Sequence, residues 1–278
     1  MHISHQTPEG KEAYPTEIPQ FGLGVFLMSD DGECKSSVVA ALKAGYTHID
    51  TASMYQNERD VGRALKETGV ERSSVFITTK LRRGDAVGYE ETIEQCKTSL
   101  ELLDTEYIDL YLVHAPPVDP EHREPVWRAM EHCLEQGWVK SIGVSNYGVA
   151  HLDAMKKYAT FMPSVNQVEY NPWLQRPHLK KATEDSGAKL MAYSPLARGH
   201  RVDDPELGAI AERLGCTPAQ VAIKFCYDQG CITIPKSSNP SRIIENIASL
   251  DVDISSEMDA ILALEENYVS GWDPTTEP

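Results

Sequence analysis

The feature that most constrains this chain is an alternation of short, β-branched apolar segments with longer amphipathic stretches, repeated eight times. The short segments have the length of strands, and the stretches between them carry apolar residues at helical spacing, as at Ile93, Cys96 and Leu100. Strands that alternate with helices pair in parallel, and eight such units close a barrel. We therefore expect an α/β fold of the (β/α)8 TIM barrel type. The expected strands are residues 21–27, 46–50, 75–80, 107–113, 139–144, 164–169, 188–193 and 231–235.

The ends of the helical stretches support this division. Thr217-Pro218-Ala219-Gln220 is a capping box with proline at the first helical position, and Asp204-Pro205 and Asn239-Pro240 are similar helix starts. Glycines stand just past six helical patterns, where a left-handed residue ends a helix: Gly45, Gly69, Gly137, Gly187, Gly215 and Gly230. The helices expected around and after the last strand are 205–214, 217–229, 242–249 and 255–266.

No linker, repeat or low-complexity segment divides the chain. Its 278 residues are close to the usual size of a (β/α)8 barrel, about 250 residues. We therefore expect residues 1–278 to form a single domain. A short C-terminal tail around Trp272 is expected to lie over the barrel mouth.

Charge and cysteine content exclude several classes of partner. A net charge of −16 repels nucleic acid and anionic membranes, so an anionic small molecule would need a local basic pocket. No apolar run approaches the roughly 20 residues of a membrane span, and the N-terminus lacks the pattern of a secretory signal. The six cysteines form no Cys-x-x-Cys pair, which predicts reduced core thiols and no metal site. The expected protein is a cytoplasmic monomer with a small-molecule partner.

Four polar residues stand at or just after the ends of expected strands: Asp50, Tyr55, Lys80 and His114. In a (β/α)8 barrel, these strand ends meet at one catalytic rim. Taken singly, each residue also has a structural interpretation, as a buried ion pair, a core histidine or a loop tyrosine. Together they predict one proton-donating site.

Each of the four residues has a definable part in one reaction. Tyrosine has an ordinary pKa near 10, and a neighbouring Lys80 ammonium would lower this value. Asp50 would keep Lys80 charged and oriented, and His114 would hydrogen-bond the substrate oxygen. The site lacks a cysteine or serine nucleophile and a metal cluster, so it suits reduction of a carbonyl by hydride. The hydride must come from a cofactor, because no side chain provides one.

The ordered motifs of the chain resemble those of the aldo-keto reductase family over nearly its whole length, from Gly22 to Asn246. The motifs are Asp50-Thr-Ala-x-x-Tyr55-x-Asn57-Glu58, Lys80, Leu112-Val-His114, Gly143-Val-Ser-Asn146, Asn166-Gln167-Val-Glu-Tyr170 and Ile234-Pro-Lys-Ser237. The chain is most similar to the short microbial and lower-eukaryote members, such as 2,5-diketogluconate reductases and prostaglandin F synthase-like reductases. The resemblance implies a barrel that binds NADPH at its C-terminal rim without a glycine-rich loop. It also implies that Tyr55 is the general acid, assisted by Lys80, Asp50 and His114.

The resemblance further implies a set of cofactor-binding residues. The nicotinamide carboxamide would bind Ser145, Asn146 and Gln167, its ring would stack on Tyr193, and the pyrophosphate would meet the loop of Ser194 and Leu196. The adenosine 2′-phosphate and adenine would be held by Lys236, Ser237, Asn239, Arg242, Glu245 and Asn246. Lysine and arginine close together would supply the basic pocket that the acidic chain otherwise lacks, and would favour NADPH over NADH. The structural alternative is a solvated pair of cations at a helix start.

The chain departs from the family around the expected substrate pocket, which comprises Phe26, Met54, Arg82, Ala115 and Trp272. Arg82 and Ala115 stand where many members have tryptophan, Phe26 also replaces a frequent tryptophan, and Asn171 replaces a frequent histidine. The loss of aromatic walls widens such a pocket. One hypothesis is that Arg82 attracts a carboxylate- or phosphate-bearing carbonyl compound. The alternative is that Arg82 points to solvent and the tail near Trp272 fills the space.

Two other functions remain open at this point. Lys80 could act as a Schiff-base nucleophile in a barrel lyase, an interpretation that leaves Lys236 and Arg242 without a role. The chain could also be a non-enzymatic NADPH-binding member of the superfamily. The presence of all four catalytic groups disfavours this second alternative, because a binding module has no need of them.

Overall fold

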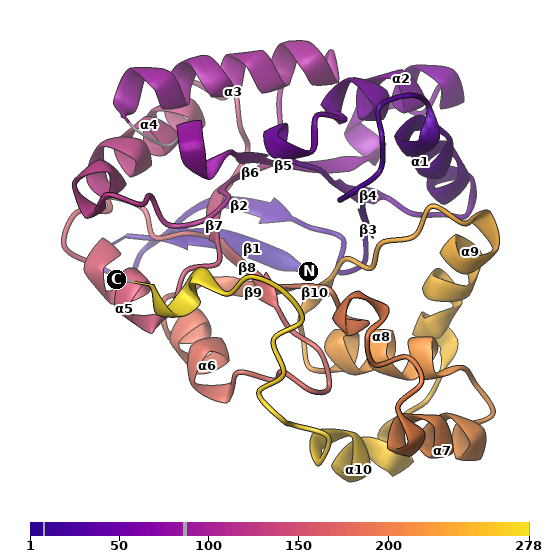
Figure 1. The fold of residues 1–278 in the computed structure, drawn as a ribbon. Coiled ribbons are helices and arrows are strands. Elements are labelled where there is room, and N and C mark those ends of the chain that lie inside the picture. The colour runs from indigo at the N-terminus through magenta and orange to yellow at the C-terminus, as the bar shows by residue number, and fades with distance from the viewer. Residues whose placement is uncertain (8, 86–87, 278) are drawn as a thin grey trace.

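The computed structural model describes residues 1–7, 9–85 and 88–277. In a parallel sheet of eight strands, each strand pairs with the next one along the chain, from β3 to β10 (Figure 1). Its strands are β3 (Leu23–Gly24), β4 (His48–Asp50), β5 (Phe76–Leu81), β6 (Leu110–Val113), β7 (Ile142–Ser145), β8 (Val165–Glu169), β9 (Lys189–Tyr193) and β10 (Ile232–Thr233). Each lies within one residue of an expected strand or inside it, so all eight strand predictions are confirmed.

The sheet closes on itself through backbone contacts between its first and last strands. Phe21 bridges Thr233 and Gly24 bridges Lys236, both in parallel. The amide of Gly22 also donates to the carbonyl of Thr233 at 3.0 Å. The arrangement is therefore the expected (β/α)8 barrel.

Helices surround the barrel and begin and end close to the residues that the sequence predicted (Figure 1). Asp204, Thr217 and Asn239 cap their helices through side-chain oxygens, which confirms the three predicted starts. All six predicted terminal glycines have positive φ, for example 65° at Gly69. The helices are α1 (Glu33–Lys43), α2 (Glu58–Thr68), α3 (Tyr89–Leu103), α4 (Arg123–Glu135), α5 (Val149–Met155), α6 (Pro177–Asp185), α7 (Pro205–Leu214), α8 (Pro218–Asp228), α9 (Pro240–Ala248) and α10 (Met258–Leu262).

The last helix is shorter than expected. The sequence predicted a helix over residues 255–266, whereas a 3-10 turn (Ser255–Glu257) leads into α10, which ends at Leu262. The following residues are drawn out of the helix, because the amides of Glu266 and Tyr268 both donate to the carbonyl of Trp173. These hydrogen bonds replace the next helical turn and direct the chain toward the barrel mouth.

An N-terminal β-hairpin was not predicted. Strands β1 (His2–Gln6) and β2 (Glu12–Glu17) pair antiparallel, and Ile3 and Ile18 pack in one cluster with the inward-facing residues of the barrel. That cluster also contains Phe76, Leu110, Leu112, Val165, Met191, Ile232 and Ile234. The hairpin therefore covers the N-terminal end of the barrel interior, away from the rim where the strands end.

The C-terminal tail is attached to the barrel rim by polar contacts. The carboxylate of Glu169, at the end of β8, accepts hydrogen bonds from the backbone amide and hydroxyl of Ser270. Arg176 pairs with Asp273 at 3.0 Å, and Arg83 pairs with Glu277 at 2.5 Å. The tail thus crosses the barrel mouth as the sequence predicted. Among the described residues, no helix is both long and apolar enough to cross a membrane.

Candidate active site

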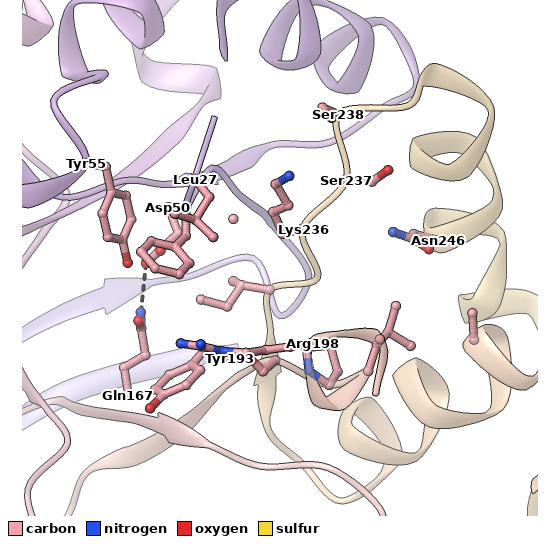
Figure 2. Close-up of a pocket in the computed structure, with 18 of the residues that line it drawn as sticks. Leu27, Asp50, Tyr55, Gln167, Tyr193, Arg198, Lys236, Ser237, Ser238 and Asn246 are labelled. Atoms are coloured by element: carbon pink, nitrogen blue, oxygen red, sulfur yellow. Dashed lines mark hydrogen bonds between the residues drawn. The ribbon is translucent and has the colours of Figure 1, made fainter. Parts of the chain in front are cut away.

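A cavity of about 940 Å³ opens at the C-terminal ends of the barrel strands. Every strand of the barrel, or the loop that follows it, contributes to the lining, and Trp272 of the tail forms part of the wall. Figure 2 shows Tyr55, Asp50 and Gln167 at one end of this cavity and Lys236, Ser237 and Asn246 at the other. The cavity is therefore long enough to contain two chemically different regions.

A buried ion pair forms the floor of the first region. The Lys80 ammonium donates to Asp50 Oδ1 at 2.6 Å, to the Thr51 carbonyl at 2.8 Å and to the Tyr55 hydroxyl at 3.4 Å. Burial lowers the pKa of Lys80, and the Asp50 carboxylate opposes that shift. All three ammonium protons of Lys80 have acceptors, so the charged form is held by the site itself.

The second oxygen of Asp50 is also engaged. Gln167 donates to Asp50 Oδ2 at 2.7 Å, a bond drawn as a dashed line in Figure 2. The same Gln167 nitrogen lies 2.8 Å from the sulfur of Met191. Because its amide nitrogen is used in this way, Gln167 presents its carbonyl oxygen as the group available to a ligand.

Tyr55 lies between the ion pair and two aromatic rings. Its ring centroid is 5.6 Å from that of His114 and 5.0 Å from that of Phe26. Burial raises the pKa of Tyr55 well above 10, the Asp50 carboxylate raises it further, and Arg198 opposes the shift. The expected lowering of the pKa is therefore not found, because burial of the phenol dominates and the Asp50 carboxylate acts in the same direction. The phenol keeps its proton at neutral pH.

His114 is a neutral imidazole. Burial lowers its pKa to about 3, and the Lys80 charge contributes to the shift. Its Nδ1 atom is buried and has no hydrogen-bond partner within the part of the chain that the structure describes. Its backbone carbonyl accepts from Asn146 at 2.9 Å, which fixes the strand end that carries it.

Asn146 joins His114 to the next two strand ends. It has a left-handed backbone conformation, with φ 60°, and its side-chain oxygen accepts from the Tyr193 hydroxyl at 2.9 Å. Ser145 donates to the carbonyl of Gln167 at 2.9 Å. These bonds hold the polar groups of four strands in one rigid set.

The second region of the cavity is cationic. Lys236 and Arg242 are exposed, and neither belongs to an ion pair among the described residues. They flank the N-terminus of α9, where Asn239 accepts from the amides of Ser241 and Arg242. Two unpaired cations and a helix N-terminus favour a phosphate. The residues present therefore fit a phosphorylated ligand.

The structure brings together nearly all the residues that the sequence predicted for the site. Every predicted cofactor-binding residue lines the cavity, as do Asp50, Tyr55 and His114. Lys80 lies behind this surface and is completely buried. Phe26, Met54, Ala115 and Trp272 also line the cavity.

Arg82 is the exception. The prediction that Arg82 lines the substrate pocket was wrong. It is exposed and does not belong to the lining, whereas the next residue, Arg83, does. Arg83 turns inward because it donates to the Pro116 carbonyl at 2.7 Å and pairs with Glu277. The alternative in which Arg82 points to solvent was therefore the better one.

Sequence reasoning missed other lining residues. The main ones are Leu27, Arg83, Arg198, Val202 and Thr217. Arg198 follows the predicted Ser194–Leu196 loop by two residues, so a prediction that extended this loop to residue 198 would have included it. Among the described residues, no group of three or more His, Cys, Asp or Glu side chains could hold a metal ion.

Comparisons with known proteins agree with this geometry. A family model described as the aldo/keto reductase family matches residues 22–264. Glyoxal reductase from Bacillus subtilis (strain 168) is 43% identical over 259 residues, which cover 93% of this chain and 93% of that protein.

Solved structures give the same result. An aldo-keto reductase from a Medee basin deep-sea metagenome library aligns with a TM-score of 0.86 and 36% identity, covering 95% of each chain. An aldo-keto reductase from Bombyx mori, solved in complex with NADP, aligns with a TM-score of 0.84 and 30% identity over 99% of this chain and 96% of that one. The chain belongs to the aldo/keto reductase family of NADP-dependent oxidoreductases.

Proposed function

We infer that this protein reduces aldehydes and ketones to alcohols with NADPH, and that Tyr55 donates the proton. The observation that carries this proposal is the contact of Lys80 with both Asp50 and Tyr55 at the floor of a cavity whose far end is cationic. A general acid and a phosphate-binding region in one cavity suit a reaction between a carbonyl compound and a phosphorylated cofactor.

Several residues support the placement of the cofactor. Lys236 and Arg242 would hold the 2′-phosphate, and Tyr193 would stack on the nicotinamide ring. The carboxamide would contact Ser145, Asn146 and the side-chain oxygen of Gln167, which would accept a hydrogen bond from the carboxamide N–H. The pyrophosphate would meet the loop of Ser194 and Leu196. When bound, NADPH supplies a hydride to the carbonyl carbon.

The proton step uses groups of this chain alone. Tyr55 holds its proton at neutral pH, because burial raises the pKa of its phenol. As negative charge develops on the substrate oxygen, Tyr55 transfers the proton to it, and the Lys80 ammonium stabilises the phenolate that results. His114, as a neutral imidazole, donates a hydrogen bond to the same oxygen and orients the carbonyl.

The alternative of a Schiff-base lyase receives less support. Lys80 is completely buried and is not among the cavity-lining residues, and its three N–H groups are occupied by Asp50, Thr51 and Tyr55. A nucleophilic lysine needs a free lone pair and access to the substrate. The non-enzymatic alternative leaves the same intact arrangement without a purpose.

The Tyr55→Phe variant tests the proposal. It removes the phenolic proton and preserves the ring that packs between His114 and Phe26. We expect the rate of NADPH oxidation with a reactive aldehyde to fall by about 10²- to 10⁴-fold, with the Kd for NADPH within about twofold of wild type. A variant that reduces the aldehyde at the wild-type rate would show that Tyr55 is not the acid.

A further inference from the structure

Arg198 lies in the cavity with its backbone in an unusual conformation. It belongs to the segment that follows β9, where Ser194, Ala197 and Arg198 have φ values of 49°, 45° and 56°. A left-handed conformation is costly for residues other than glycine, and it persists only where the surroundings enforce it. The segment thus fixes the direction in which the Arg198 side chain leaves the chain.

That direction is toward the catalytic end of the cavity. Figure 2 shows the Arg198 side chain extended toward Gln167 and Tyr193 and away from Lys236. Its guanidinium carbon lies 5.7 Å from the ring centroid of Phe26, whose own centroid is 5.0 Å from that of Tyr55. Arg198 and Tyr55 therefore border the same aromatic ring.

The tail leaves room for this guanidinium. A Cβ atom at Gly271 would lie 2.7 Å from the guanidinium carbon of Arg198 and 2.9 Å from its Nη2. Any side chain at position 271 would therefore displace Arg198. The backbone of the tail therefore lies beside the guanidinium, although Arg198 as a whole is exposed to solvent.

Among the described residues near Tyr55, Arg198 is a cation whose charge is not paired. Lys80 is paired with Asp50, and Arg83 is paired with Glu277. Across residues 1–7, 9–85 and 88–277, no ion pair or hydrogen bond engages the Arg198 guanidinium, which lies over the ring of Phe26. Glu169 lies within its electrostatic range, but that carboxylate accepts from Ser270.

We propose that Arg198 binds a carboxylate of the substrate, so that the enzyme favours aldehydes and ketones that carry a carboxylate. This inference rests on the proposed carbonyl reduction at Tyr55. A guanidinium presents a planar pair of N–H donors that matches a carboxylate, and this guanidinium has no anionic partner among the described residues. The carbonyl would lie at Tyr55 and His114, and the carboxylate would lie beyond Phe26.

A matched pair of substrates tests this assignment. The probes are 4-formylbenzoate, which carries a carboxylate one benzene ring away from its aldehyde, and its neutral methyl ester. We expect Arg198→Gln to lower the ratio of kcat/KM for the acid to kcat/KM for the ester by roughly tenfold or more, mainly through KM. Arg198→Lys keeps the charge without the fork and should give an intermediate ratio.

Arg82→Gln is the control, because Arg82 is exposed outside the cavity and its removal changes the net charge by the same amount. The ratio should stay at the wild-type value in this variant. Two outcomes would overturn the inference: an unchanged ratio in Arg198→Gln, or an equal loss for acid and ester with a raised Kd for NADPH, which would assign Arg198 to the cofactor. If Arg198→Gln still reduces the ester, the proposed carbonyl reduction stands even when the inference about Arg198 fails.

Discussion

Lys80 and Asp50 form an ion pair from which water is excluded, with 2.6 Å between Nζ and Oδ1 and side-chain exposures of 0% and 3%. Removing one partner leaves the other charge buried without compensation, which typically costs about 3–5 kcal/mol. We therefore expect Lys80→Met to lower the free energy of unfolding by an amount of this order. Urea denaturation measures it.

The double variant Asp50→Asn with Lys80→Met separates charge from packing. It removes both charges, so its loss of stability should be clearly smaller than that of Lys80→Met alone. Both proteins should lack reductase activity. If the double variant is no more stable than Lys80→Met alone, the unpaired charge of Asp50 does not account for the loss.

The buried, neutral His5 should make the folded protein less stable in acid. Its Nδ1 lies 2.9 Å from the Met162 carbonyl, and its Nε2 lies 3.3 Å from the Ile142 amide, which requires a neutral ring that donates from Nδ1. Burial lowers its pKa to about 4, against an opposing hydrogen bond to Met162. Between pH 6.5 and 4 the unfolded chain therefore binds a proton that the folded one does not. Stability should fall by up to about 1.4 kcal/mol per pH unit from this group as the pH drops.

Unfolding of wild type and His5→Gln at several pH values between 4 and 7 measures this contribution. Other titrating groups, including the buried His48 and His114, are present in both proteins and cancel in the comparison. The His5→Gln curve should be flatter by up to about 1.4 kcal/mol per pH unit. Parallel curves would mean that His5 does not couple protonation to folding.

The sequence predicted the barrel because each strand is a local signal and the strand order follows the chain. Asp50, Lys80 and His114 could be placed together for the same reason, since parallel strand ends meet at one rim. The expected single domain, monomeric state and cytoplasmic location stay predictions.

The features that the sequence did not predict share a physical cause: they depend on contacts between distant parts of the chain. The hairpin strand Glu12–Glu17 is mostly polar, and it is held by Ile3 and Ile18 inserting into a barrel interior far away in sequence. Arg82 and Arg83 could not be told apart, because the choice depends on the carbonyl of Pro116 and on Glu277. The pKa of Tyr55 depends on burial, which a motif does not reveal.

Arg242 predicts selectivity between the two nicotinamide dinucleotides. It is exposed at the start of α9 and lines the cationic end of the cavity. A charged hydrogen bond to a phosphate contributes about 1.5–3 kcal/mol, so Arg242→Gln should raise the Kd for NADPH by roughly 10- to 100-fold and leave that for NADH nearly unchanged. Fluorescence titration with each dinucleotide measures both values. An equal rise in the Kd for NADPH and for NADH would show that Arg242 does not bind the 2′-phosphate.

The close contact between Gly148 and Thr275 of the tail allows the role of the tail in substrate binding to be tested. A Cβ atom there would overlap the Thr275 carbonyl oxygen and lie 2.9 Å from the carbonyl carbon, although the glycine has an ordinary φ of −84°. Gly148→Ala should therefore push the tail off the rim and withdraw Trp272 from the cavity wall. We expect faster chymotrypsin cleavage after Tyr268 and Trp272 and a several-fold higher KM for aldehydes, on the order of the roughly 1 kcal/mol typical of lost packing contacts.

Gly208→Ala is the matched control for this steric argument. Gly208 lies inside α7 with no atom within 4 Å of an added Cβ, so alanine there should stabilise the helix by about 0.5–1 kcal/mol and leave cleavage and KM unchanged. Each variant adds one methyl group, and only the methyl group at position 148 meets a neighbouring backbone. If Gly148→Ala leaves the protease sensitivity and the KM of the enzyme at their wild-type values, the tail adjusts to the methyl group, and the contact of Gly148 with Thr275 does not hold Trp272 in the cavity wall.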